Sequence, residues 1–288
     1  TSTASTDISS MRIVGSVRCV LATALENSFH GRTITTVKAT GQSSFHQSKF
    51  APYPDGFSFN AIDDVYNAID DETVAVMIEL VQGEGGVFPF DKEKIKELAK
   101  FLKENDILLI IDEVQTGVFR TGEFLASNLY EIEPDIITLA KGIGGGVPMG
   151  AVMTKHKDIW TAGDHGSTFG GNYLVTAAAL EVLDILENLK DSGTLDETII
   201  YFTKKLNDIF EANRDIFITH VGLGLMRGLR VKDADTLASL IKTAFEFGVM
   251  VLKSGNNTLR FLPALTISKS EIDEGFIRLQ KAITKIKS

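Results

Sequence analysis

Two short, largely apolar runs that each end in a charged residue constrain the fold of this chain most. Residues 107–111 are followed by Asp112, and residues 136–140 are followed by Lys141 at the start of a glycine-rich turn. Such runs, alternating with helical patterns, are typical of parallel strands, which lie about 5 Å apart in a sheet. The carboxyl ends of parallel strands form one edge of the sheet, where α/β proteins bind ligands. We therefore expect Asp112 and Lys141 to lie close together at that edge.

The chemistry of this acid and amine indicates a pyridoxal phosphate site. A lysine among apolar neighbours loses its proton more readily, because burial disfavours the ammonium form, and a neutral amine can attack a carbonyl. A carboxylate one strand away suits a cofactor that carries a protonated ring nitrogen. Lys141 and Asp112 are the residue types that hold pyridoxal phosphate covalently and pair with its pyridinium.

Two nucleotide-binding interpretations of the same segments are disfavoured. An ATPase would need a G-x-x-x-x-G-K-[ST] loop, and Lys141 precedes its glycine instead of following one. A G-x-G-x-x-G dinucleotide motif fails because its third glycine would fall on Val147 or Met149. The remaining alternative is that Asp112 caps a helix and Lys141 is a solvated loop residue. Their joint placement at adjacent strand ends weighs against it.

The composition excludes several other classes of protein. A formal net charge of −9 argues against nucleic acid as a partner, because phosphate binding relies on clustered Lys and Arg. Cys19, the single cysteine, excludes an intramolecular disulfide and a cysteine-based metal site, so we expect no metal and a cytoplasmic protein. No stretch approaches the ~20 apolar residues of a membrane-spanning helix, so no membrane partner is expected.

The pattern of elements predicts an α/β fold with a mostly parallel central sheet, helices on both faces and a smaller α+β domain at the C-terminus. We expect residues 1–25 to be an atypical or truncated segment, 26–190 a large cofactor-binding domain and 191–288 the small domain. Strands are predicted at 74–80, 107–111, 136–140 and 225–231, with short ones near Val249 and Leu259. Helices are predicted at 92–104, 174–189, 195–212, 234–247 and 271–286.

Three further segments carry polar groups suited to a ligand. Glu84 lies within the glycines of 82–86, which allow a sharp backbone bend. Residues 164–172 combine hydroxyls and glycines just before a predicted helix, a setting that suits phosphate oxygens. Phe29 offers an aromatic face to a planar cofactor, and Arg32 can grip a carboxylate. Taken singly, Glu84 is equally well explained by a surface turn, and residues 164–172 are weak evidence. A core aromatic and a surface arginine are the more common explanations of Phe29 and Arg32.

Several long motifs in register resemble those of the class III, or ornithine-type, aminotransferases of fold type I, which use pyridoxal phosphate. The similarity runs from residue 26 to the C-terminus. Its signatures are Ser-Phe-His-Gly-Arg-Thr at 28–33, Val-Gln-Gly-Glu-Gly-Gly at 81–86, Leu-Ile-Ile-Asp-Glu-Val-Gln-Thr-Gly at 109–117, Leu-Ala-Lys-Gly at 139–142 and Gly-Ser-Thr-Phe-Gly-Gly-Asn at 166–172.

The resemblance implies roles for the cofactor site. Lys141 would bind the cofactor covalently and shuttle a proton, and Asp112 would keep the ring nitrogen protonated. Gln115 would lie near the phenolic oxygen, Phe29 would stack on the ring, and His30 would also be a cofactor-binding residue. A further cofactor contact would cross a homodimer, since Thr168 would reach the phosphate bound by the neighbouring subunit.

The resemblance also implies how two carboxylate substrates would bind. Arg32 would hold the distal carboxylate of 2-oxoglutarate or the carboxylate of the amino donor, with assistance from Ser167. Arg260 would bind the α-carboxylate of the keto acid. Glu84 would pair with Arg260 when an ω-amino donor, which lacks a carboxylate there, is bound.

Within the class, the Gly-Asp-His-Gly-Ser-Thr stretch at 163–168 is most similar to the acetylornithine subfamily. That resemblance implies transfer of an amino group from N2-acetylornithine to 2-oxoglutarate in arginine biosynthesis, giving N-acetylglutamate 5-semialdehyde and glutamate. Ornithine, succinylornithine and 4-aminobutyrate transaminases are the alternatives. The family's upstream phosphate-binding turn has no counterpart in residues 1–20, so we expect a truncated start with weak cofactor binding. An inactive partial chain that serves only as a dimerisation partner is the alternative from a different class.

Overall fold

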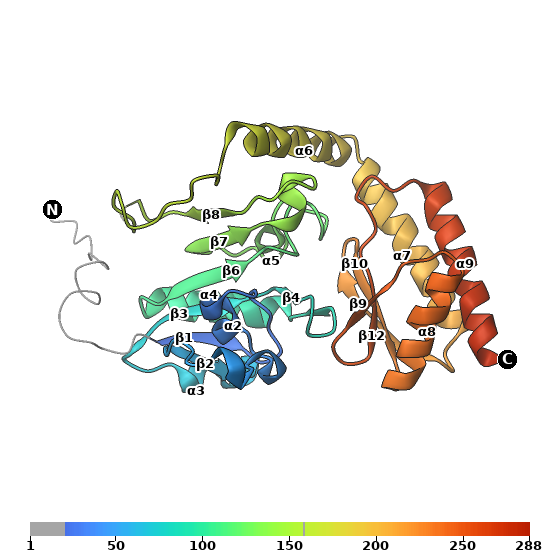
Figure 1. Ribbon diagram of the computed structural model, residues 1–288, viewed down its shortest axis with the longest axis horizontal. Helices are drawn as coiled ribbons and strands as arrows, with labels where there is room; N and C mark the ends of the chain where they lie inside the picture. Colours follow the sequence, from blue (N-terminus) through green and yellow to red (C-terminus); the bar gives the residue numbers. More distant parts are fainter. Residues whose placement is uncertain (1–20, 158) are drawn as a thin grey trace.

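The computed structural model describes residues 21–157 and 159–288, and its first half is built on a six-stranded sheet (Figure 1). The strand order is β2-β1-β3-β6-β7-β8, and every pairing is parallel except that of β7 with β8. The mostly parallel sheet predicted from the sequence is confirmed. The strands are β1 (Leu21–Leu25), β2 (Phe57–Asn60), β3 (Thr73–Ile78), β6 (Leu108–Asp112), β7 (Ile136–Leu139) and β8 (Ala151–Thr154).

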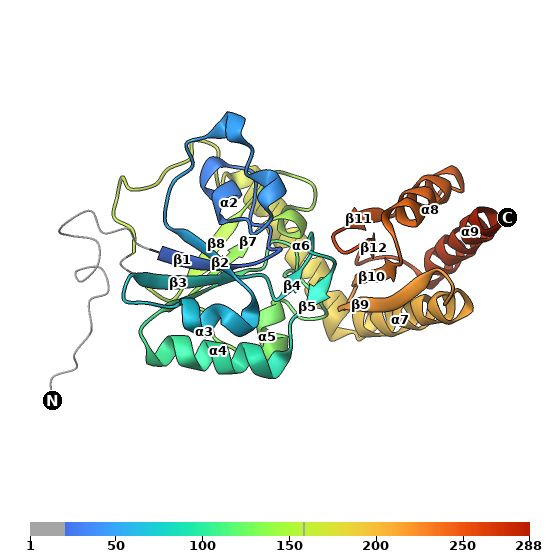
Figure 2. The ribbon, with the colours of Figure 1, turned by 90° about the horizontal axis from the view of Figure 1, so that it is seen from below.

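Helices cover both faces of this sheet, with α3, α4 and α5 on one side and α2 on the other (Figure 2). Helix α4 spans the predicted 92–104, because Asp91 caps it by accepting a hydrogen bond from the Lys94 amide. Its buried Leu98 and Leu102 pack against the sheet core. The helices around this sheet are α2 (Ile34–Ala39), α3 (Val65–Ala68), α4 (Lys92–Glu104) and α5 (Ala126–Tyr130). The 3-10 turns of the same half are η1 (Ser43–Phe45), η2 (Ser48–Phe50), η3 (Ile62–Asp64) and η4 (Lys141–Gly144).

The segment expected to be atypical, 1–25, includes a strand of the central sheet. Its residues 21–25 form β1, which lies between β2 and β3. Residues 1–20 and their predicted features, Cys19 among them, lie outside the described part of the chain. The division into 1–25, 26–190 and 191–288 stays a prediction.

A second, antiparallel sheet with the order β11-β12-β10-β9 forms the C-terminal part, and α7, α8 and α9 gather beside it (Figure 1). The long helix α6 connects the two parts. The elements are α6 (Tyr173–Asp191), α7 (Thr194–Ala212), β9 (Phe217–Leu223), β10 (Met226–Val231), α8 (Ala234–Glu246), β11 (Leu252–Ser254), β12 (Thr258–Phe261) and α9 (Lys269–Lys287), and a small two-stranded sheet of β4 (Val81–Gln82) and β5 (Phe88–Pro89) belongs to the first half.

The short strand predicted near Val249 lies slightly further along the chain, at β11. The Val249 amide donates to the Ala244 carbonyl just after the end of α8, so the strand begins only at Leu252. Strand β9 was not predicted, because Thr219 and His220 interrupt its apolar pattern. Within residues 21–157 and 159–288, no helix combines the length and the apolar character that crossing a membrane requires.

Candidate active site

Asp112 and Lys141 line one cavity of about 270 Å³ at the carboxyl edge of the parallel sheet. Asp112 is the last residue of β6, and it lies opposite Thr138 of β7. Lys141 follows β7 after a single residue. The other lining residues come from three different loops and are Phe29, His30, Gly31, Arg32, Glu79, Val114 and Gln115.

The carboxylate of Asp112 is buried and held by three hydrogen bonds. Its Oδ2 lies 2.8 Å from Nδ1 of His30, and its Oδ1 accepts from the Val114 amide at 3.0 Å and from the Thr138 hydroxyl at 3.2 Å. Nε2 of His30 is buried without a hydrogen-bond partner among the described residues. These contacts come from three segments of the chain, and they fix the orientation of the carboxylate in the cavity.

Lys141 has a backbone conformation that few residues with a side chain adopt. Its φ is +50°, in the left-handed region, and such strain concentrates at functional sites. The residue as a whole is exposed in the single chain, but protein atoms crowd the amine enough to lower its pKa, while Asp112, Glu79 and Glu84 oppose that shift. The exposure shows that water still reaches the side chain. A lowered pKa increases the neutral amine that nucleophilic chemistry requires.

A third acid in the cavity, Glu79, was not among the predicted site residues. It is buried directly after β3, where one oxygen accepts from the Phe29 amide at 2.8 Å and the other from the Gly83 amide at 3.2 Å. Burial raises its pKa to about 7; the charge of Asp112 adds to the increase and His30 opposes it. A sequence signal was present, since Glu79 follows a strand run just as Asp112 does. Its burial depends on loops that the run itself does not specify.

We expect this buried carboxyl to make stability fall as pH rises. A carboxyl whose folded pKa is about 7, against an ordinary 4.5, favours the folded state at low pH and loses that contribution as pH rises through 7. In cofactor-free protein, the free energy of unfolding relative to Glu79→Gln should therefore fall by up to roughly 3 kcal/mol between about pH 4.5 and pH 8. Urea unfolding across that range measures it, with the exposed Glu133→Gln as control. Parallel curves for wild type and Glu79→Gln would refute the assignment.

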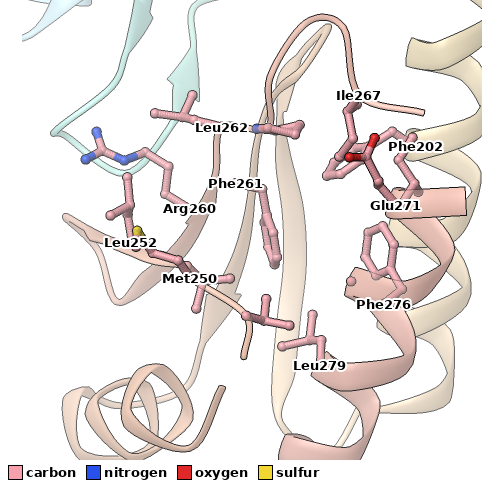
Figure 3. Close-up of a pocket in the computed structure, with 15 residues that line it drawn as sticks. Phe202, Met250, Leu252, Arg260, Phe261, Leu262, Ile267, Glu271, Phe276 and Leu279 are labelled. Carbon is pink, nitrogen blue, oxygen red and sulfur yellow. The ribbon is translucent and has the colours of Figure 1, made fainter. Parts of the chain in front are cut away.

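An ion pair between the two halves of the chain lies beside the site: neither of its residues lines the 270 Å³ cavity, but Arg260 contacts the lining residue Gln115. Nη1 of Arg260 donates to Oε1 of Glu84 at 2.7 Å, to the Gly83 carbonyl at 3.0 Å and to Oε1 of Gln115 at 3.4 Å. Figure 3 shows Arg260 and the next residue, Phe261, pointing in different directions, with Phe261 in an apolar cavity of the C-terminal part. The packing of Phe261 fixes β12 and so directs Arg260 toward the large sheet.

Phe29 and Arg32 lie at the rim of the cavity. The guanidinium of Arg32 is 5.7 Å from the ring centre of Phe29 and 5.1 Å from that of Phe45, within the range of a cation–π contact. Arg32 is exposed, so its donors remain accessible to an anion. The two side chains place an aromatic face and a positive charge side by side, while their predicted roles toward cofactor and substrate stay predictions.

Ser167 and Thr168 do not line this cavity in the described chain. Both are exposed in the segment before α6, and the Ser167 hydroxyl accepts a hydrogen bond from the Gly170 amide at 2.9 Å. The structure therefore does not bring them to Lys141 of the same chain. Their predicted roles, of which that of Thr168 crosses a dimer, stay predictions.

Comparison with known proteins agrees with this geometry. The family model for class III aminotransferases matches residues 20–283. An acetylornithine aminotransferase of Wolinella succinogenes is 54% identical over 273 residues, which are 94% of this chain and 69% of that protein. A succinylornithine transaminase of Salmonella enteritidis is 42% identical over 272 residues, covering 92% of this chain and 66% of that protein. The chain thus spans about two thirds of the length of these relatives.

A solved structure shows the same architecture. The ornithine aminotransferase of Toxoplasma gondii superimposes with a TM-score of 0.85 at 30% identity, covering 93% of this chain and 65% of that one. That structure is described as having partial occupancy of pyridoxal phosphate at its active site. The match extends over both the parallel and the antiparallel sheet, since it takes in nearly the whole chain.

The cavity fits pyridoxal phosphate, the cofactor of this family. It offers a fixed carboxylate for a ring nitrogen in Asp112, an aromatic wall in Phe29 and an amine of lowered pKa in Lys141. The buried Nε2 of His30 has no hydrogen-bond partner among the described residues, so it can form a hydrogen bond with a bound ligand. With a family model over most of its length and a relative at 54% identity, this chain belongs to the class III aminotransferases.

Proposed function

We propose that the protein transfers the ω-amino group of N2-acetylornithine to 2-oxoglutarate, giving N-acetylglutamate 5-semialdehyde and glutamate, as in arginine biosynthesis. The observation that supports this most directly is the Arg260–Glu84 pair beside the cavity, where Arg260 contacts the lining residue Gln115. A keto acid can displace Glu84 and place its α-carboxylate on Arg260, whereas an ω-amino donor has no carboxylate there and leaves the pair intact. Succinylornithine is the second candidate donor, because the Salmonella relative carries that name.

The residues of this chain divide the chemistry among them. When bound, pyridoxal phosphate supplies an electron sink that stabilises negative charge on the substrate carbon. Asp112 holds a negative charge at the base of the site, Phe29 forms its wall and Lys141 moves a proton at its Nζ atom. Gln115 accepts a hydrogen bond from the Arg260 guanidinium and so helps to orient it. Arg32, beside Phe29, attracts the second carboxylate of either substrate.

We expect Arg260→Ala to separate the two half-reactions. Loss of a charge-assisted contact to the keto-acid carboxylate should slow the 2-oxoglutarate half-reaction by about 10- to 100-fold, equivalent to roughly 1.5–3 kcal/mol. The acetylornithine half-reaction should change much less, because Glu84 already neutralises the arginine when that donor binds. Single-turnover absorbance changes measure both, and Arg278→Ala, on the exposed face of α9, is the control. Equal losses in both half-reactions would contradict the proposed use of the pair.

We further propose a homodimer whose two active sites are shared. The segment that carries Ser167 and Thr168 leads into apolar side chains that are unusually exposed, with Phe169 at 81%, Tyr173 at 96% and Leu174 at 73%. A second copy that covers this surface would remove the apolar groups from water and bring Thr168 to the partner's cavity. A cytoplasmic location is proposed with it, since a single cysteine suits a reducing compartment.

Mixing two inactive variants tests the shared site. Lys141→Ala and Thr168→Ala each damage a different part of one composite site, so a mixed dimer should contain one site with both residues intact. We expect mixtures of the two unfolded and refolded variants to regain activity that neither variant shows alone. Two Lys141→Ala preparations mixed in the same way are the control. Absence of recovery in a sample that sedimentation shows to be a mixed dimer would argue for self-contained sites.

A further inference from the structure

A hairpin turn of the C-terminal sheet is hydrogen-bonded to the glycine-rich loop that carries Glu84. The Ser254 hydroxyl accepts from the Gly86 amide at 2.9 Å and donates to the Gly83 carbonyl at 2.7 Å. The Gly255 amide donates to the Glu84 carbonyl at 2.8 Å. The Asn256 side chain donates to the Gly85 carbonyl at 2.9 Å. Every residue of the 83–86 loop is thus bound to the 254–256 turn, which we call the clasp.

The clasp depends on a backbone approach that side chains would prevent. A Cβ atom at Gly255 would lie 2.8 Å from the Glu84 carbonyl oxygen, which is too close for ordinary contact. Asn256 and Asn257 have φ values of 51° and 50°, the left-handed pair that a tight hairpin turn of this hand requires. Ser254 itself is only 3% exposed, so water does not substitute for its two hydrogen bonds. The turn is therefore shaped and buried to hold this loop in one position.

The clasp acts on the same loop as the Arg260–Glu84 pair. The Gly83 carbonyl accepts from both Ser254 and Arg260, so the loop position that satisfies the turn also places Oε1 of Glu84 on the guanidinium. Arg260 follows the turn within the next strand, β12, so the turn and the arginine move together. Nε of Arg260 is buried without a hydrogen-bond partner among the described residues, so this nitrogen can still donate a hydrogen bond to a ligand.

We propose that Ser254 and Asn256 are specificity-determining positioning residues: by holding the 83–86 loop, they keep Glu84 on Arg260 and set how readily a substrate carboxylate replaces it. The inference rests on the proposed use of Arg260 for the keto acid. When the clasp does not hold the 83–86 loop, Glu84 competes less well with a substrate carboxylate for Arg260. Carboxylates should then reach Arg260 more easily, and discrimination in favour of donors without a carboxylate at that position should decline.

Two variants and a matched control test the clasp. Ser254→Ala removes two hydrogen bonds, and Asn256→Gly removes one while keeping the left-handed backbone accessible. Asn257→Gly is the control, because it alters the adjacent left-handed residue, whose side chain makes no hydrogen bond within the described ranges. Both clasp variants should bind 2-oxoglutarate about three- to tenfold more tightly by calorimetry, as the loss of one neutral hydrogen bond would allow. Amide exchange in the 83–86 loop should be faster in both.

The outcomes separate the clasp from the proposed substrate. Unchanged exchange in both clasp variants, or equally fast exchange in Asn257→Gly, overturns the clasp. Faster exchange with unchanged or weaker 2-oxoglutarate binding overturns its role in specificity. If the unaltered protein binds no 2-oxoglutarate, the proposed keto acid is wrong, and exchange in the loop still decides whether the turn holds it. A Ser254→Ala variant that does not fold leaves the decision to Asn256→Gly, which removes no buried hydroxyl.

Discussion

Lys141→Ala should abolish transamination, with turnover reduced by at least about 10³-fold, because the substitution removes both the nucleophilic amine and the group that moves the proton. The lysine lies next to the end of β7 and lines the same cavity as the fixed carboxylate of Asp112, and its lowered pKa increases the fraction of neutral amine. Borohydride reduction of the cofactor-loaded wild type should attach the cofactor permanently to Lys141. The same treatment of the variant should leave no label in the peptide that contains residue 141.

Peptide mapping gives this prediction a direct control. Lys100→Ala, on the exposed face of α4, should retain both the label on Lys141 and normal turnover. The assignment of Lys141 would be wrong if the reduced wild type carried the label on another lysine. It would also be wrong if the cofactor were demonstrably bound and no lysine were labelled.

Asp112→Asn should reduce turnover by about 100-fold or more while leaving the fold intact. The change is nearly isosteric, but it removes the negative charge that would face the cofactor ring nitrogen. Each unit by which that charge raises the pKa of the nitrogen corresponds to about 1.4 kcal/mol, so a shift of a few units accounts for a loss of this size. Steady-state turnover measures the effect, and the absorbance spectrum of the cofactor-loaded protein reports the change at the ring.

A half-buried carboxylate at the other end of the same strands provides the control. Asp135 lies at the opposite edge, at the start of β7, where it accepts from the Leu109 amide and pairs with Lys155 and His156. Asp135→Asn should lower stability through these contacts and leave turnover nearly unchanged. Equal loss of turnover in the two variants would mean that Asp112 acts only through the stability of the sheet.

Local signals in the sequence were sufficient for the elements that frame the site. Helix α4 was predicted over its observed range, because apolar residues at helical spacing act within a few residues of each other. The strand runs before Asp112 and Lys141 are similar local signals, and the handedness of parallel connections then brings their ends together. The ion pair of Glu84 with Arg260 came from the family motifs, since 176 positions separate the two residues and no local pattern connects them.

The tertiary structure alone decided how the groups around those strand ends behave. Glu79 follows its strand just as Asp112 does, but only the loops carrying Phe29 and Gly83 bury it and raise its pKa to about 7. Likewise, Ser254 stands in a short hairpin with nothing local to indicate that it bonds the loop beside Glu84. The sequence by itself determined the strand ends, their charges and the class of chemistry, because those depend on short-range patterns. Burial and long-range hydrogen bonds, which set protonation and loop position, depend on which distant segments pack together.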